Sequence, residues 1–124
     1  MNDKIKIRSV IKGLNTANSG VEEKFQNETL RPIIKLQHDL LVAYFKAYLV
    51  TKKCKFKEFS ELKRIDFIKA AFQKDNAFKA ELKGIIIGQF TTKEFEVYCS
   101  NKSDFNKRIL TMIEQRIASV IDLF

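Results

Sequence analysis

The stretch from Leu40 to Val50 most constrains the fold, because every residue in it except Lys46 is apolar. It is the second half of a longer segment, residues 30–50, whose apolar positions fall on two neighbouring faces of a helix. A helix that is apolar on nearly all sides has to be covered on nearly all sides. We therefore expect residues 30–50 to form a central helix that the other helices cover.

The chain is long enough for one core and poor in residues that favour turns. It has 124 residues, of which 45% are hydrophobic, 4 are glycine and 1 is proline. A chain of this length buries roughly two thirds of the surface that it exposes when unfolded. So few glycines and prolines argue against a sandwich or barrel with many turns. The predicted fold is all-α, a compact four- to five-helix bundle over residues 21–124.

Residues 1–20 have no helical period, few large apolar groups and several glycine, asparagine and serine residues. This composition is typical of a mobile segment, and it carries a net charge of +3. We expect a mobile basic N-terminal arm. Branched and basic residues alternate near its start, so its addition as a strand to a partner's sheet edge stays open. The alternating residues are Lys4, Ile5, Lys6, Ile7, Arg8 and Val10.

Two starts are open for the central helix. Thr29 can act as an N-cap, which places Pro32 in the first turn, where the missing N–H has no partner to lose. Alternatively, one helix runs from about residue 21 to residue 50 and is kinked at Pro32.

Cap signals divide the rest of the chain into further helices. After the central helix, residues 51–59 form a basic connection that Phe56 and Phe59 fasten to the core. Helices are then expected near residues 61–74, 77–88, 91–99 and 103–124. Their predicted N-caps are Ser60, Asp75 or Asn76, Thr91 with Glu94 as a capping box, and Ser103.

Apolar spacing predicts which side chains these helices bury. The expected inward positions are Leu62, Ile65, Ile68 or Lys69, Phe72, Phe78, Leu82, Ile85 and Ile86. Gly84 lies inside a predicted helix, where glycine costs about 1 kcal/mol relative to alanine, so we expect a close approach of another helix there. Gly88 is expected to be a C-terminal cap. A short strand over residues 85–87 is the alternative.

No pattern for catalysis or for a cofactor occurs in the sequence. His38 is the only histidine, and we interpret it as a polar position on a helix. Cys54 and Cys99 are too few for a disulfide framework or a metal site, so reduced thiols are expected. No apolar run reaches the roughly 20 residues of a membrane span, and the N-terminus does not have the pattern of a signal peptide. We therefore expect no cofactor, no metal, no membrane and a cytoplasmic location.

Positive charge is concentrated in two parts of the chain. Of the formal net charge of +8, residues 1–20 carry +3 and residues 52–64 carry +4. Clustered lysines hold phosphates, and an aromatic residue among them can stack on a base. The candidate contacts for nucleic acid or another anion are Lys4, Lys6, Arg8, Lys52, Lys53, Lys55, Phe56, Lys57, Lys63 and Arg64.

Three segments resemble a small family of short, all-helical bacterial proteins that often carry the label glyoxalase. The resemblance covers roughly residues 25–124 and implies an all-helical fold. Its motifs are structural, so it implies no catalytic residue in this chain. Metal-dependent glyoxalases bind their ion through His and Glu, whereas this chain has 1 His. The segments are FQNETLRPIIKLQHDLL (25–41), LKGIIIGQFTTKEFEVY (82–98) and NKRILTMIEQRI (106–117).

The sequence favours a non-enzymatic binding or regulatory module that associates with itself or with a protein partner through its helices. The reason is an excess of apolar surface in residues 40–50 and in a last helix that stays apolar to its end. The expected contacts are Gly84, Ile117, Ile121 and Phe124. The alternative is a nucleic-acid- or ribosome-associated protein that uses residues 1–12 and 52–64.

Overall fold

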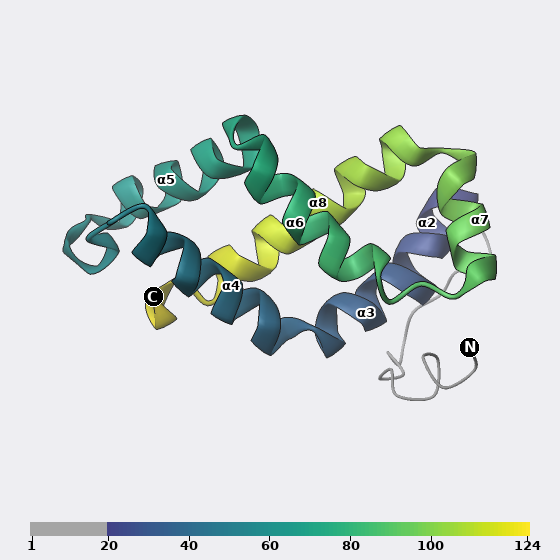
Figure 1. Ribbon diagram of the computed structural model, residues 1–124, viewed down its shortest axis with the longest axis horizontal. Coiled ribbons are helices and arrows are strands. Elements are labelled where there is room, and N and C mark those ends of the chain that lie inside the picture. The colour runs from purple at the N-terminus through teal and green to yellow at the C-terminus, as the bar shows by residue number, and fades with distance from the viewer. Residues whose placement is uncertain (1–19) are drawn as a thin grey trace.

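The computed structural model describes residues 20–124 and folds nearly all of them into helices (Figure 1). The predicted arm, with Lys4, Lys6 and Arg8, lies outside the described residues except for Gly20. No described residue is in a β-strand, which confirms the predicted all-α class and excludes a strand over residues 85–87. The elements are α2 (Val21–Phe25), the π-helical turn η1 (Gln26–Leu30), α3 (Arg31–Leu36), α4 (His38–Thr51), the 3-10 turn η2 (Phe56–Glu58), α5 (Glu61–Lys74), α6 (Asn76–Ile87), α7 (Thr92–Ser100), α8 (Lys102–Ser119) and the 3-10 turn η3 (Ile121–Leu123).

The last long helix, α8, lies at the centre of the molecule (Figure 1). Its inward side chains recur every four residues and are fully buried. They form a ridge of the kind that packs into the grooves of neighbouring helices, and α8 contacts α3, α4, α5, α6 and α7. The bundle is therefore organised around α8 more than around residues 30–50. The ridge consists of Phe105, Ile109, Ile113 and Ile117.

Helix α4 is covered on one side, so the expectation that residues 40–50 are buried on nearly all sides is wrong. Leu41, Phe45 and Leu49 point into the core. Alanine and tyrosine made this stretch look more apolar than its burial requires, because alanine buries little area and tyrosine keeps its hydroxyl near water. Four apolar residues stay exposed along the outer side: Leu40, Ala43, Ala47 and Val50.

From Val21 to Thr51 the helical elements α2, η1, α3 and α4 follow one another, interrupted only by a turn at Gln37. This arrangement agrees better with the predicted single kinked helix than with a helix that starts at Thr29. Thr29 is buried inside η1 and caps nothing. A proline ring collides with the carbonyl four residues earlier in a regular α-helix. Here that carbonyl belongs to the wider π-helical turn η1, which relieves the collision. The helix bends at Gln37, which has φ −91° and ψ 10° and still keeps hydrogen bonds to both sides.

Most of the predicted helix starts are confirmed by hydrogen bonds from the first turn. The last helix is the exception, because α8 begins at Lys102 without a side-chain cap and Ser103 lies inside its first turn. Leu62 is also not an inward residue, since it is 76% exposed. The confirmed caps are Ser60, Asp75 and Thr91, which forms the capping box with Glu94.

Gly84 does not mark a close approach between helices of this chain. It is exposed on α6, and a Cβ added to it would have no atom within 4 Å outside its own helix. Gly88 follows the last residue of α6, as predicted, with a right-handed φ of −61°. A Cβ on Gly88 would lie 3.1 Å from the Gly84 carbonyl oxygen.

Aromatic rings fasten the end of the chain to the core. The ring of buried Phe124 lies 4.7 Å from that of Phe45 and 6.3 Å from that of Phe56. Phe56 in turn contacts the ring of Phe67 on α5 at 5.9 Å. Edge-to-face contacts of this kind add about 0.5–1.5 kcal/mol each beyond the area that they bury. They hold η2, α4 and the C-terminal residues together at one end of the molecule.

We predict that Ile113→Ala lowers the free energy of unfolding by about 2–5 kcal/mol, because it opens a cavity in the central ridge. Urea unfolding followed by circular dichroism measures this change. Leu62→Ala on the exposed side of α5 is the matched control and should change stability by less than about 0.5 kcal/mol. Equal effects of the two substitutions would contradict the central position of α8.

We predict that Gly84→Ala raises the free energy of unfolding by about 0.5–1 kcal/mol, because alanine favours the helix and meets no neighbour. Thermal unfolding of a dilute sample tests this. Gly88→Ala is the control, and its crowded Cβ should remove most of the gain. A loss of stability in Gly84→Ala would mean that another chain packs on Gly84, as the sequence suggested.

Candidate functional site

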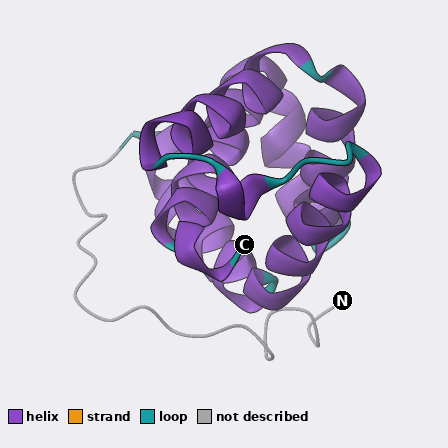
Figure 2. Cartoon of the chain, turned by 90° about the vertical axis from the view of Figure 1, so that its left-hand side faces the viewer, coloured by secondary structure: helices purple, strands orange, loops and turns teal. Residues whose placement is uncertain are grey.

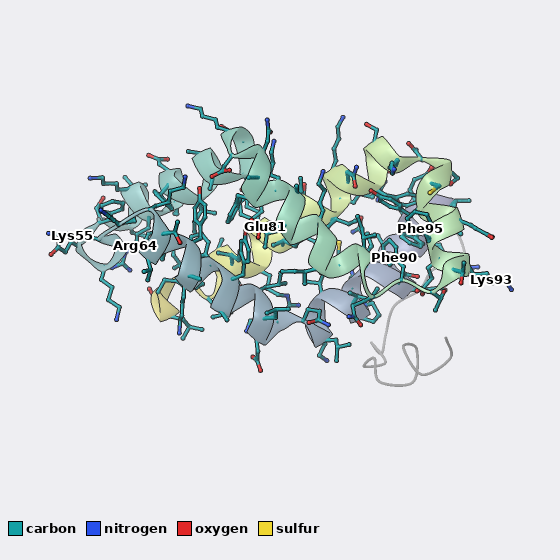
Figure 3. The ribbon with its side chains drawn as sticks, viewed as in Figure 1. Lys55, Arg64, Glu81, Phe90, Lys93 and Phe95 are labelled. Atoms are coloured by element: carbon teal, nitrogen blue, oxygen red, sulfur yellow. The ribbon has the colours of Figure 1, made fainter. Side chains whose placement is uncertain are left out.

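An open cleft of about 530 Å³ lies between the end of α4, η2 and the last residues of the chain. We call it the C-terminal cleft. Leu49, Phe56 and Phe124 form a buried apolar floor, and Val50 and Leu123 stand at its edge with 77% and 54% of their surface exposed. Figure 2 looks onto this end of the molecule, and Figure 3 labels Lys55 and Arg64 there.

Three lysines surround the C-terminal cleft. Lys46 comes from α4, and Lys55 and Lys57 come from the connection that contains η2. All three are exposed, and within residues 20–124 none of them forms an ion pair. Glu58 is the one acidic side chain in the lining. The cleft therefore combines an apolar floor with a positively charged edge.

The backbone at the end of α4 places these lysines. Lys53 has a φ of 52°, and its N–H donates to the Val50 carbonyl, while the N–H of Cys54 donates to that of Leu49. This is the Schellman arrangement, in which the left-handed residue is usually glycine. The turn reverses the chain and brings Cys54 back against Leu49, so both line the cleft.

Two other predicted cations, Arg64 and Lys63, are engaged in contacts within the chain. Arg64 donates to the backbone carbonyls of Phe56 and Lys57 at 3.1 and 2.8 Å. The Lys63 Nζ lies 4.2 Å from the centre of the Phe59 ring. These contacts hold η2 against α5.

Phe56 is buried in the floor, so it cannot stack on a base as the sequence suggested. Of the ten predicted anion contacts, four lysines are exposed and have no ion pair within the described part of the chain: Lys53, Lys55, Lys57 and Lys63. The structure brings Lys55 and Lys57 together with Lys46, which sequence reasoning did not single out, around one cleft. The one sequence signal of Lys46 is that it interrupts the apolar stretch of residues 40–50.

Lys52 belongs to a different cluster, between α4 and α6. Its Nζ lies 3.6 Å from the carboxylate of Asp75, which also accepts a 2.7 Å hydrogen bond from the Tyr48 hydroxyl. These bonds, with the backbone N–H of Phe78, hold the pKa of Asp75 below its usual value. Burial and the same carboxylate raise the pKa of Tyr48. Neither group is poised for proton transfer near neutral pH, which indicates a structural cluster.

The remaining polar candidates show no catalytic arrangement. The Nδ1 of His38 lies 3.3 Å from a guanidinium nitrogen of Arg116. Cys54 and Cys99 are free thiols, and burial raises the pKa of Cys54. Within residues 20–124, no three His, Cys, Asp or Glu side chains come together as a metal site would need.

The residues predicted to mediate association differ in how far they are exposed. Ile117 and Phe124 are buried within their own chain and offer no contact surface. Ile121 is partly buried against the same core, whereas Gly84 is exposed. The end of the chain is thus held by its own core.

Comparison with known proteins finds no family model that matches the chain, and no curated protein or solved structure that is significantly similar to it. The resemblance of residues 25–124 to short helical bacterial proteins stays a prediction. Across residues 20–124, every helix is too short or too polar to cross a membrane.

We predict that Asp75 contributes to stability at neutral pH and that its contribution is lost at acid pH. Its pKa is depressed in the folded protein, so the stabilisation is present above the ordinary value of 3.8 and disappears as the pH falls through the lower folded pKa. Asn caps helices about as well as Asp does. Asp75→Asn should therefore flatten the loss of stability below about pH 4.

Urea unfolding at several pH values measures this dependence. Asp122→Asn is the control, because that carboxylate is 96% exposed and lies 4.0 Å from Arg64. If both variants change the pH dependence equally, Asp75 has no special ionic role.

Proposed function

We propose that this protein is a non-enzymatic, cytoplasmic binding module that associates through the C-terminal cleft. The observation that carries the proposal is the combination of exposed Val50 and Leu123 with lysines that form no ion pair within residues 20–124. Exposed apolar groups inside a polar edge are typical of association sites. The matching surface is an acidic amphipathic helix of a protein partner or of a second copy.

Typical interaction energies indicate that the apolar contacts of the cleft provide most of the affinity and that the lysines determine which partner binds. Complete burial of one aliphatic side chain contributes about 1.5–3 kcal/mol. An exposed ion pair contributes at most about 1 kcal/mol. Val50 and Leu123 therefore supply most of the attraction, whereas Lys46, Lys55 and Lys57 select an acidic partner and speed its approach.

A second copy offers a matching surface at the opposite end of the molecule. Helices α2 and α7 lie at that end (Figure 1), and Val21 on α2 and Phe95 on α7 are 62% and 43% exposed. Residues 21–28 carry three glutamates and one lysine. A contact between unlike ends is heterologous and can repeat along a row of molecules. This supports head-to-tail self-association as one form of the proposed function.

For self-association, we expect the mass measured by light scattering to rise with protein concentration in 50 mM salt and less in 500 mM salt. Val50→Ser combined with Leu123→Ser should keep the protein monomeric, because it removes the apolar contact. Leu62→Ser, equally exposed but outside the cleft, is the control. A monomer under all conditions rules out self-association and leaves the protein partner.

For a protein partner, the probe is a labelled helical peptide with leucines on one face and glutamates on the other. We expect fluorescence anisotropy to show binding that falls at least tenfold when Lys46, Lys55 and Lys57 are all replaced by Gln. The control replaces Lys74, Lys93 and Lys107, which are exposed outside the cleft. Failure of both this test and the self-association test overturns the proposed function.

Nucleic-acid binding is the second candidate, and the exposed Lys53, Lys55 and Lys57 support it. It predicts that an oligonucleotide binds in 50 mM salt and that affinity falls steeply by 200 mM salt, because phosphate contacts release counterions. Phe56 is buried and cannot stack on a base, so the contacts from residues 52–64 would be electrostatic. Absence of binding at low salt eliminates this candidate.

A further inference from the structure

A second cleft, of about 380 Å³, lies between α3 and α8. It shares no residue with the C-terminal cleft. Arg31 and Lys35 reach it from α3, one turn apart, and Arg116 reaches it from the last turn of α8. Among residues 20–124, no carboxylate lines this cleft. The full lining is Arg31, Ile34, Lys35, Met112, Gln115, Arg116 and Ser119.

Within residues 20–124, the hydrogen-bond partners of Arg31 and Arg116 carry no negative charge. Arg31 donates from Nε to the side-chain oxygen of Asn27 at 2.9 Å. Arg116 lies 3.3 Å from the Nδ1 of His38, a nitrogen that accepts a hydrogen bond only when it has no proton. Within residues 20–124 neither arginine, nor Lys35, forms an ion pair. Three positive groups therefore share one cleft, and no described acidic residue lines it or pairs with them.

Such a cluster is electrostatically unfavourable until an anion joins it. Like charges repel one another, and the repulsion is strongest where a group is partly withdrawn from water, as Arg116 is. The negative end of the α8 dipole opposes an anion here, but it is equivalent to about half a charge. Three unit positive charges outweigh that half charge, so the cleft attracts anions.

The residue types narrow the class of anion. A guanidinium presents parallel N–H donors that match a phosphoryl group or a carboxylate, and two arginines with one lysine suit a doubly charged group. The side-chain amide of Gln115 adds a neutral donor at the edge. Buried Ile34 and half-buried Met112 give an apolar floor for the carbon part of a ligand.

We infer that the α3/α8 cleft binds a small phosphorylated molecule, with Arg31, Lys35 and Arg116 holding the phosphoryl group. A volume of about 380 Å³ suits a small ligand. This site goes beyond the proposed function, because it uses none of the residues of the C-terminal cleft. A phosphoryl group also occurs in the backbone of nucleic acids, so the test separates the two sources.

The test is isothermal titration calorimetry of the full chain with inorganic pyrophosphate and with glycerol 3-phosphate, in buffers matched in ionic strength with chloride. We expect both to bind. Arg116→Gln should weaken binding at least tenfold, because it removes charge-assisted hydrogen bonds. Lys107→Gln removes one positive charge from an exposed position on the same helix and should change affinity less than twofold.

Three results overturn the inference. The first is that neither phosphorylated probe binds above the chloride background. The second is an equal loss of affinity in Arg116→Gln and Lys107→Gln, which indicates attraction to overall charge and not a site. The third is that an oligonucleotide binds in an Arg116-dependent way whereas the small probes do not, which assigns the cleft to a nucleic-acid backbone. Circular dichroism of both variants verifies that they are folded.

Discussion

Burial of the α8 ridge is the interaction on which the rest of the structure depends. The ridge of Phe105, Ile109, Ile113 and Ile117 is the surface that α3, α4, α5 and α6 share. Each of these helices buries one apolar side, and without a common partner each would leave that side in water. Because α8 fills this role, the outer side of α4 and the two ends of the molecule remain free for other contacts.

The sequence predicted local features well and long-range burial less well. Ser60, Asp75 and Thr91 were correct because a cap depends on hydrogen bonds within one turn, which the local residues determine. Leu62 was misplaced because its spacing fits an inward stripe, and only the position of the neighbouring helices decides which side of a helix is covered.

The candidate sites show the same contrast between local features, which the sequence predicted, and long-range contacts, which it did not. The lysines of residues 52–64 were visible as a cluster in the sequence, but their division into exposed and engaged side chains depends on the fold around η2. Arg31 and Arg116 gave no signal, since 85 positions separate them in the chain. Contacts between such distant positions depend on how α3 lies against α8, and no single-sequence pattern encodes that.

The π-helical turn before Pro32 has a consequence for the whole N-terminal end. A π-helical turn holds one residue more than an α-helical turn, and one residue corresponds to about 100° of rotation about the helix axis. The turn therefore sets the direction in which α2 faces. In this direction the ring of Phe25 lies 4.7 Å from that of Phe105 and 5.5 Å from that of Phe90. A homologue one residue shorter between residues 26 and 30 would present a different side of α2 to the core, so length in this turn is as constrained as side-chain identity.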